Sequence, residues 1–343
     1  MGFTVERLYN GCMDGTGIEA TSIPADLPPL VVVTGAGGFI GGHLLPALRE
    51  AGFRTRAVTR LAAGDAGLPG ADETVAHPGV STTADWRPLV ADSQAVIHLA
   101  GLAHLPVDDR PMRQALRRIN VLATEQLAQA AAAAGVATFV FMSSIKAVAD
   151  HSGDQPLTEA SACRPEDCYG VAKRAAERRL ERLARQAPAM RMLILRPPLV
   201  YGPGVGANFA ALVRLVGRGL PLPLGAIRNR RSLVYVGNLT DAIVRCLERP
   251  QVPSGIFHVS DGEPVSTPEL VAAIASAQGR PARLLAVPPH WLGLAASVAG
   301  RGPQFSRLAG SLEVSNRRFC EAFGWTAPFR LEQGLRATVA DRG

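Results

Sequence analysis

The stretch Val31–Leu44, VVVTGAGGFIGGHL, passes from an apolar segment through a glycine-rich turn into a segment with helical periodicity. Residues 30–33 are mostly β-branched, as in a strand buried within a parallel sheet. After the turn, Leu44, Leu45 and Leu48 recur at the spacing of one helix face. The stretch therefore predicts a strand, a turn and a helix, the opening unit of an α/β protein with a doubly wound parallel Rossmann sheet.

The glycines of this turn, Gly35, Gly38 and Gly41, fall at the spacing G-x-x-G-x-x-G. Gly35 permits the tight turn, Gly38 lets a phosphate approach the backbone, and Gly41 lets the helix pack closely on the strand. Because a helix N-terminus favours negative charge, the turn is expected to hold the pyrophosphate of a dinucleotide. We assign Phe39 and Ile40, at the start of the helix, to the same cofactor site.

The composition is ordinary for an α/β protein, with 343 residues of which 47% are hydrophobic. No apolar run reaches the roughly 18 residues that a membrane-spanning helix needs. We expect a nucleotide-binding body with a smaller C-terminal α/β lobe, a flexible leader over residues 1–29, and a cytoplasmic location because no secretory signal is evident. The five cysteines lack C-x-x-C spacing, so neither a disulfide framework nor a metal site is expected.

The formal net charge is +7. The arginines are distributed over several helices rather than gathered in one stripe with aromatic residues, so solvated helix faces and an anionic small substrate explain the charge, and no nucleic-acid partner is expected. Only Lys146 and Lys173 among the 36 lysines and arginines are lysine. We expect lysine to be used at positions where arginine could not perform the same function, and both lysines lie near the proposed catalytic residues described below.

The second predicted strand, at residues 54–59, ends without the acidic residue that a dinucleotide fold places about 20 positions beyond the glycine loop to bind the adenosine ribose. Arg60 stands there instead and suits a 2′-phosphate, which favours NADP(H) over NAD(H). The alternative for Arg60 is an ordinary exposed residue at a strand end.

Further strands are expected at residues 73–76, 95–100 and 139–144, and helices at 85–90 and 112–134. The strand at 95–100 would bring Ala100 and Gly101 to the carboxyl edge of the sheet, where the cofactor crosses. Asn120, within the long helix, is either a structural cap or a contact on the cofactor side.

Tyr169 and Lys173 form a Y-x-x-x-K pair, which places both side chains on one helix face. Free tyrosine titrates near pH 10, so we expect the lysine cation to favour the phenolate, while its ammonium also bonds the ribose hydroxyls. Ser144, at the end of a predicted strand, would hold the substrate oxygen while Tyr169 transfers a proton and the nicotinamide transfers hydride.

At this point the chain resembles the extended short-chain dehydrogenase/reductase family, particularly its nucleotide-sugar branch of NAD-dependent epimerase/dehydratase-like enzymes. The resemblance covers roughly residues 30–335. The segments that carry it are TGAGGFIG at the first turn, HLAG ending at Gly101, FMSSIK around Ser144, YGVAK, RPPLVYGPG from Arg196, NRRSLVYVGNLTDAI from Asn229 and FGWTAP from Phe323.

The resemblance implies a domain division. Residues 30–196 would form the dinucleotide-binding domain, with 232–262 returning to it, and residues 197–231 and 263–343 would form the substrate lobe. A homodimer is also expected, through a four-helix interface built by residues 113–134 and 169–186 of each copy.

For the site, the resemblance implies that Ser144, Tyr169 and Lys173 are catalytic and that Pro197 lies beside the nicotinamide. Asn208 and Arg231 would hold a nucleotide diphosphate, and a planar guanidinium suits a buried pyrophosphate on physical grounds as well. Further candidates for substrate contacts are Lys146 and Arg307, each with a solvated surface role as the alternative.

The reaction is expected to oxidise or reduce a sugar at C4. The fifth predicted strand ends without the adjacent acid pair of the 4,6-dehydratases of this branch, so dehydration is not expected. The missing acid near Arg60 favours an NADPH-dependent 4-ketoreductase. The NRRSLVYVGNL segment resembles that of enzymes that reduce a UDP-4-keto-6-deoxy-N-acetylhexosamine for surface polysaccharide synthesis, which implies this substrate and role. The alternatives are a UDP-hexose or UDP-N-acetylhexosamine 4-epimerase that keeps NAD bound, and a non-catalytic NADP-binding sensor or assembly protein.

Overall fold

The computed structural model describes residues 27–60, 67–77, 85–103, 109–300 and 302–341, except the side chains of residues 303, 304 and 307. Most of the predicted leader, residues 1–26, lies outside this range. Within it, parallel strands form a seven-stranded sheet in the order β3-β2-β1-β4-β5-β6-β9. The strands of this sheet are β1 (Leu30–Thr34), β2 (Arg54–Thr59), β3 (Glu73–Ala76), β4 (Ala95–His98), β5 (Thr138–Met142), β6 (Arg191–Arg196) and β9 (Gly255–His258).

Helices connect these strands, and two further parallel strands, β7 (Leu199–Tyr201) and β8 (Leu233–Tyr235), pair outside the main sheet. The helices are α1 (Phe39–Glu50), α2 (Arg87–Val90), α3 (Arg110–Leu116), α4 (Thr124–Ala133), α5 (Cys168–Gln186), α6 (Ala207–Gly217), α7 (Val236–Glu248), α8 (Thr267–Ala277), α9 (Pro289–Val298), α10 (Gly302–Ala309), α11 (Arg317–Phe323) and α12 (Leu331–Ala340). A π-helix, η1 (Arg117–Ala123), joins α3 to α4, and a 3₁₀ turn, η2 (Ile145–Ala147), follows β5. The predicted α/β fold with a parallel Rossmann sheet is confirmed.

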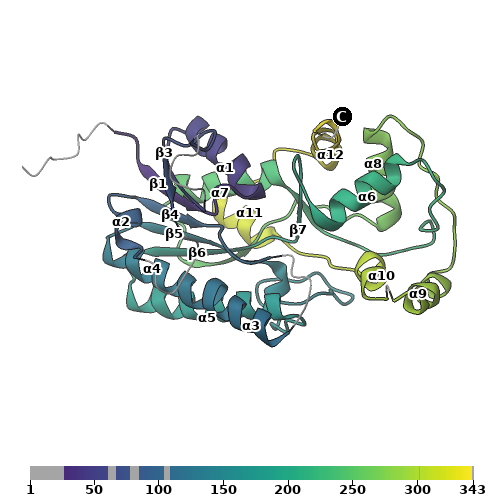
Figure 1. Ribbon diagram of the computed structural model, residues 1–343, viewed down its shortest axis with the longest axis horizontal. Helices are drawn as coiled ribbons and strands as arrows, with labels where there is room; N and C mark the ends of the chain where they lie inside the picture. The colour runs from purple at the N-terminus through teal and green to yellow at the C-terminus, as the bar shows by residue number, and fades with distance from the viewer. Residues whose placement is uncertain (1–26, 61–66, 78–84, 104–108, 301, 342–343) are drawn as a thin grey trace, which may run out of the picture.

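The sheet is buried on both faces because its strands are apolar at successive positions. Val31 and Val33 of β1 belong to one core cluster with Leu44 of α1, while Val32 belongs to a second cluster with Leu127 of α4. Successive side chains of a strand point to opposite faces, so the continuous valine run requires cover on both. Figure 1 shows α1, α7 and α11 on one side of the sheet and α2, α4 and α5 on the other.

The smaller lobe lies beyond the carboxyl ends of the strands, at the right of Figure 1. Its core is a separate apolar cluster that includes Phe209 of α6, Ile274 of α8 and Leu335 of α12. Strand order reverses between β1 and β4, which lie side by side with the connections running to opposite edges. In open α/β sheets ligands bind at such a switch point, so the fold directs a cofactor toward the side that carries the lobe.

Part of the segment assigned to the lobe from the sequence, residues 263–343, lies on the sheet instead. Phe319 and Phe323 of α11 and the following Trp325 are buried in the same cluster as Val31 and Val33. Phe323 packs edge-on against Phe257 of β9, with the ring centroids 5.2 Å apart. The segment returns because three large aromatic rings at this spacing need a deep apolar surface, which β9 and α7 provide.

The first helix packs very closely on the turn that precedes it. A Cβ atom at Gly41 would lie 2.3 Å from the Ala36 carbonyl oxygen, whereas a Cβ at the next residue, Gly42, would have no atom within 4 Å. Gly41 therefore permits the approach of helix and turn that the sequence predicted, and Gly42 does not contribute to it.

We expect Gly41→Ala to lower the free energy of unfolding by about 1–3 kcal/mol, because α1 must shift away from the Ala36 carbonyl. Gly42→Ala is the matched control one residue away, and it should raise stability by about 0.5–1 kcal/mol through helix propensity. Urea unfolding of both variants measures the difference. Equal midpoints for the two variants would show that the close approach does not limit the packing.

Candidate active site

The N-terminus of α1 is built to receive an anion. Its N-cap residue is Gly38, which is exposed and supplies no side-chain cap, and the first turn of the helix carries no acidic residue. A Cβ atom at Gly38 would meet only the Gly35 carbonyl oxygen, at 3.2 Å. The uncapped backbone amides and the helix dipole fit the pyrophosphate of a dinucleotide.

The glycine turn and the end of β4 meet at the switch point. Gly35 has φ +72°, and a Cβ there would lie 2.7 Å from the Ala100 amide nitrogen, so both the conformation and the contact require glycine. Asn120 is buried in the π-helix η1; its side chain accepts from the Leu102 amide at 2.7 Å and donates to the Leu102 carbonyl at 2.9 Å. These bonds give Asn120 a structural role, because its amide holds the loop that contains Gly101, and its contact with the cofactor stays a prediction.

The remaining cofactor candidates occupy the same edge of the sheet. Phe39 and Ile40 open α1 and are half-buried. Pro197 is buried just after β6, and its carbonyl accepts from the Ile145 amide at 3.0 Å, which places it beside the 3₁₀ turn that follows Ser144. Arg60 is exposed immediately after β2, and its contact with a 2′-phosphate stays a prediction.

The predicted catalytic residues come together. Ser144 is the N-cap of η2, and its hydroxyl is hydrogen-bonded to the hydroxyl of Tyr169 in the first turn of α5. One helical turn later, Lys173 is buried; its ammonium donates to the Met142 carbonyl at 2.7 Å and lies 5.8 Å from the centroid of the Tyr169 ring. The group thus joins the end of β5 to the buried face of α5.

The protonation of this group differs from the expectation. Burial raises the pKa of Tyr169 to about 12, the Asp167 carboxylate adds to the rise, and the hydrogen bond with Ser144 opposes it. Burial also lowers the pKa of Lys173 to about 8, against the pull of the Glu177 carboxylate. The expectation that Lys173 would lower the pKa of Tyr169 is not met in the protein alone, because the ammonium is itself desolvated and points to the Met142 carbonyl.

The sequence patterns did not predict the buried polar residues that lie beneath the catalytic group. Glu177 lies one turn beyond Lys173 and is fully buried; it accepts from the Ser143 hydroxyl at 2.5 Å and from Arg196 of β6 at 2.8 and 2.6 Å. Burial alone would raise the pKa of Glu177, but the hydrogen bonds and charge of Arg196 hold it below its ordinary value. The signal was present, since Tyr169, Lys173 and Glu177 recur every four residues and therefore share one helix face.

Lys146 does not point freely toward a substrate. Its ammonium pairs with Asp150 at 2.8 Å and with Asp167, the N-cap residue of α5. These ion pairs connect the turn after Ser144 to the start of the catalytic helix. A substrate contact through Lys146 stays a prediction, and the geometry gives the residue a positioning role.

The proposed diphosphate residues lie on the lobe side. Arg231 donates to the Gly310 carbonyl at 2.9 Å, and burial lowers the pKa of its guanidinium. The backbone of Arg231 pairs with that of Leu312. Two residues further along, Val314 pairs with Leu157, which lies in the loop after η2. The segment 312–314 therefore connects Arg231 to the loop that follows Ser144 and η2. Asn208 is exposed in the first turn of α6, and the side chain of Arg307 lies outside the described residues.

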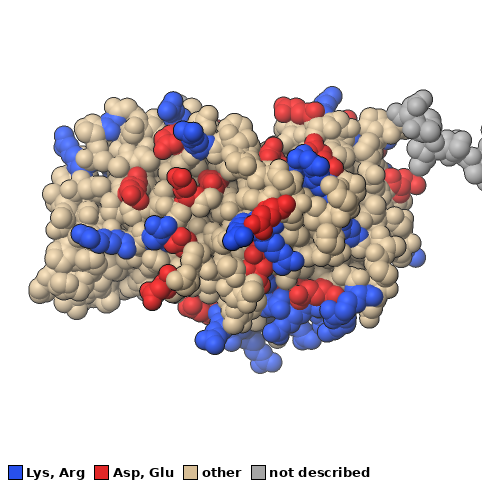
Figure 2. All heavy atoms as spheres, turned by 180° about the vertical axis from the view of Figure 1, so that it is seen from behind, with Lys and Arg blue, Asp and Glu red and all other residues tan. Residues whose placement is uncertain are grey.

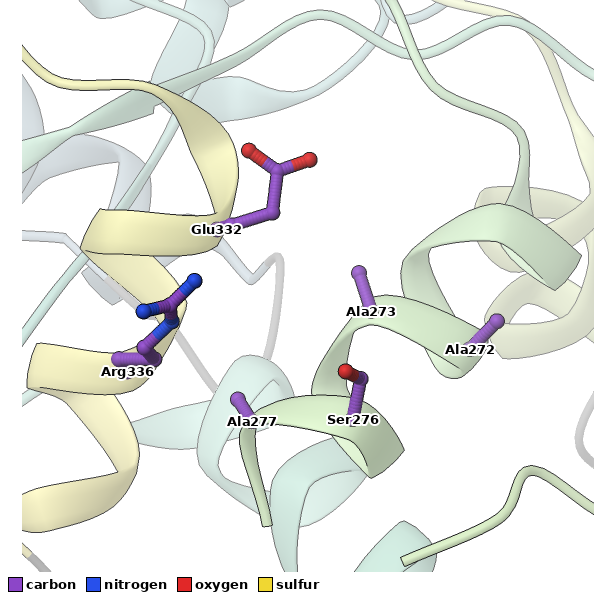
Figure 3. Close-up of a pocket in the computed structure, with 6 residues that line it drawn as sticks. All are labelled: Ala272, Ala273, Ser276, Ala277, Glu332 and Arg336. Atoms are coloured by element: carbon purple, nitrogen blue, oxygen red, sulfur yellow. The ribbon is translucent and has the colours of Figure 1, made fainter. Parts of the chain in front are cut away.

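A hollow of about 300 Å³ lies elsewhere, between α8 and α12, and contains none of the predicted site residues. Figure 3 shows Glu332 and Arg336 of α12 facing Ala273 and Ala277 of α8 across it. The described residues contain no cluster of histidine, cysteine or carboxylate side chains that could hold a metal ion. The cysteines in the described part of the chain form no disulfide.

The chain is similar to known proteins. The family model described as "NAD dependent epimerase/dehydratase family" matches residues 31–259. The chain is 36% identical over 318 residues to a UDP-glucose 4-epimerase of Vibrio cholerae, covering 91% of this chain and 95% of that protein. It is 25% identical to the N-acetyl-alpha-D-glucosaminyl-diphospho-ditrans,octacis-undecaprenol 4-epimerase of Escherichia coli O157:H7, covering 90% of this chain and 94% of that one.

A solved structure agrees with these relatives. The structure of MoeE5 in complex with UDP-glucuronic acid and NAD is 28% identical to this chain and covers 91% of it, with 98% of that protein matched and a TM-score of 0.71. The match extends over the sheet and the lobe together.

We expect Arg196→Met to cost about 3–5 kcal/mol of unfolding free energy, because it leaves the Glu177 carboxylate buried without its main partner. The double variant Glu177→Leu/Arg196→Met should lose less than the sum of the single variants, as measured by urea unfolding. Arg317→Met, which removes an exposed ion pair with Glu321, is the control and should leave the midpoint unchanged.

The pH dependence of the same variants follows from the lowered pKa of Glu177. As the pH is lowered to 4.5, the ordinary pKa of this group, and below, the unfolded chain binds a proton that the folded protein does not. The free energy of unfolding of the wild type therefore decreases as the pH decreases in this range. The free energy of unfolding of the double variant should decrease less over the same pH range. Additive single effects, or identical pH profiles, would mean that the pair is not coupled.

Proposed function

The chain belongs to the NAD-dependent epimerase/dehydratase family, and on that premise we propose that it interconverts the C4 epimers of a UDP-sugar with NAD held in its site. The observation that carries the proposal is the hydrogen-bonded pair of Ser144 and Tyr169, with Lys173 behind it, at the edge of the sheet that carries the uncapped helix α1. The relatives reported above are named as 4-epimerases, which favours an enzyme over the alternative of a non-catalytic sensor.

Each residue has a definite task in this reaction. The Ser144 hydroxyl would bind the oxygen at C4 of the sugar, and Tyr169, after releasing its own proton to solvent, would take the proton from that oxygen and later return it. Lys173 keeps a positive charge against Met142 and Tyr169, which offsets the high pKa of the phenol when its proton leaves. NAD, when bound, supplies the hydride-accepting and hydride-returning chemistry at C4.

The support for NAD over NADP comes from the relatives rather than from Arg60. The solved MoeE5 structure contains NAD, and the 36% identical relative is named a 4-epimerase. The preference for NADP drawn from the missing acid rests only on Arg60, which is exposed after β2. We therefore replace the expected NADPH-dependent reductase by an epimerase as the first candidate, and keep the 4-ketoreductase as the second because of Arg60.

The diphosphate of the substrate would bind near Arg231. Its half-buried guanidinium is planar and donates to the Gly310 carbonyl, and burial lowers its pKa. A diphosphate is common to UDP-sugars and to the undecaprenol-linked sugar named for the relative in E. coli O157:H7. We favour the UDP-sugar because the relative with higher identity is named for one. A role in surface polysaccharide synthesis stays a prediction.

The homodimer implied by the resemblance also stays a prediction. In its favour, Val171 of α5 is 53% exposed on the face where two copies would meet. Against it, Arg118, Arg178 and Arg182 are exposed on the same helices. A two-fold axis would bring these like charges toward one another, so the pairing needs acidic partners across the axis.

We expect Tyr169→Phe to lower kcat by about 10²–10⁴-fold, because the C4 oxygen loses its proton acceptor, while the bound nucleotide remains. Tyr235→Phe, which changes a tyrosine of β8 in the same way, is the control and should keep full activity. Both rates are measured with the substrate identified below. Retention of activity by Tyr169→Phe would exclude the proton-transfer role.

The proposal is tested by denaturing the purified protein and identifying the released nucleotide by mass spectrometry. We expect NAD, and conversion of UDP-glucose or UDP-N-acetylglucosamine to the C4 epimer without added cofactor, a reaction that Tyr169→Phe should lack. An empty site, together with stoichiometric oxidation of NADPH by a UDP-4-keto-6-deoxy sugar, would contradict the epimerase and establish the reductase.

A further inference from the structure

Lys146 contacts both of the chain segments that carry the catalytic hydroxyl groups. Its backbone amide donates to the Ser144 hydroxyl at 3.2 Å. Its carbonyl lies against the first turn of α5, because a Cβ atom at Gly170, the residue after Tyr169, would come within 2.3 Å of that oxygen. Its ammonium pairs with Asp167, the N-cap residue of the same helix. Lys146 therefore joins the end of β5 to the start of α5 through both its backbone and its side chain.

The Asp167 carboxylate is fixed close to the Tyr169 phenol. Its Oδ1 atom accepts from the Gly170 amide at 2.7 Å, which is the N-cap hydrogen bond of α5, and its Oδ2 atom accepts from the Lys146 ammonium. After burial, the charge of Asp167 is the next cause of the raised pKa of Tyr169. A carboxylate at this position disfavours the phenolate, which is the form that takes the proton from the C4 oxygen.

The Lys146 ammonium lies between two carboxylates from different segments. Besides Asp167 it pairs with Asp150, four residues further along the chain, at 2.8 Å. Burial alone would lower the pKa of Lys146, but the hydrogen bonds and charges of the two carboxylates raise it above its ordinary value. Lys146 is therefore protonated at neutral pH, and its removal would leave both carboxylates without this cation.

This group of three charges is partly shielded from water. The side chain of Lys146 is 29% exposed, and those of Asp150 and Asp167 are 19% and 29% exposed. By comparison, Arg317 and Glu321 form an ion pair with side chains 82% and 62% exposed. Figure 2 shows acidic and basic side chains of this exposed kind on one face of the molecule. Because salt screens exposed charges most, Lys146 should act on the phenol more strongly than a surface cation would.

The other groups around Tyr169 do not replace this cation. The Lys173 ammonium lies 5.8 Å from the centroid of the ring but donates to the Met142 carbonyl. From the side of α3 and η1, the apolar residues Leu116 and Val121 belong to the small cluster against which Tyr169 packs. Lys146 is thus the cation that directly contacts the carboxylate next to the phenol.

We propose that Lys146 is a positioning residue, which holds the first turn of α5 against the turn of Ser144 and neutralises Asp167 so that Tyr169 can accept the C4 proton. A compact ammonium with three donors suits a bridge between two carboxylates, which accounts for lysine in a chain whose basic residues are nearly all arginine. The inference rests on the proposed function, in which Tyr169 takes the proton from the C4 oxygen.

The test measures kcat against pH for the conversion of the UDP-sugar by the full chain with its bound nucleotide. In the wild type, kcat should rise with pH along a limb that reports the ionisation of Tyr169. Lys146→Met should lower kcat about three- to tenfold at each pH on this limb, a displacement of about 0.5–1 pH unit toward higher pH, because Asp167 then disfavours the phenolate without opposition. The KM for the UDP-sugar should stay unchanged.

Three further variants show whether Lys146 acts through Asp167. Lys146→Met/Asp167→Asn should return the limb most of the way to its wild-type pH, because asparagine still caps α5 but carries no charge. Lys146→Arg keeps the positive charge and should keep the limb near its wild-type pH. Asp150→Asn removes the carboxylate that is not part of α5 and, as the matched control, should not move the limb to higher pH.

Two results would overturn the proposal. An unmoved limb with a raised KM in Lys146→Met would establish the substrate contact expected from the sequence instead. A limb displaced equally in Lys146→Met and in Lys146→Met/Asp167→Asn would show that the effect does not pass through Asp167.

Asp167→Asn alone provides the test if Lys146→Met does not fold. It should displace the limb toward lower pH, and an unmoved limb would again overturn the proposal. Failure of the proposed function gives a different result, because Tyr169→Phe would then remain active. An inactive Tyr169→Phe variant together with unmoved limbs in the Lys146 and Asp167 variants would reject only the role of Lys146.

Discussion

Burial of charged side chains along one face of α5 is the constraint on which the active site depends. Tyr169, Lys173 and Glu177 succeed one another at four-residue intervals; Lys173 and Glu177 are buried against β5 and β6, and Tyr169 is half-buried. Such a face is stable only because each group finds a partner: Ser144 for the tyrosine, the Met142 carbonyl for the lysine, and Arg196 for the glutamate. The hydrogen bonds and the ion pair that stabilise these buried groups therefore also fix the position of the catalytic residues.

The same burial sets the chemistry. A phenol with a pKa of about 12 keeps its proton at neutral pH, and an ammonium with a pKa of about 8 is still mostly protonated there. The reactive pair is therefore not preset as phenolate and ammonium in the protein alone. Substrate and cofactor must supply the remaining electrostatic change, which suits a site whose proton transfer should begin only when both are bound.

The two parts of the molecule divide the work by their position on the sheet. The parallel strands place the glycine turn, the loop held by Asn120 and the end of β5 at one edge, where the order of the strands reverses. The lobe side joins that edge through backbone pairing of residue 231 with 312 and of residue 314 with 157, and through the small apolar cluster of Ile145, Val148, Leu312 and Val314. Its far end carries α9, whose exposed apolar face belongs to no core of the described residues.

Much of this was determined by the sequence alone, because the information is local. The valine run, the glycine spacing and the Y-x-x-x-K pair fix a strand, a turn and a helix face within a few residues. The rest depended on segments far apart in the chain. The pairing of Glu177 with Arg196, the return of Phe319 and Phe323 to the sheet, and the pairing of Lys146 with Asp167 each require two elements to meet. Periodicity states which residues share a face, but only tertiary packing decides whether that face is buried, what opposes it, and therefore which way its pKa values move.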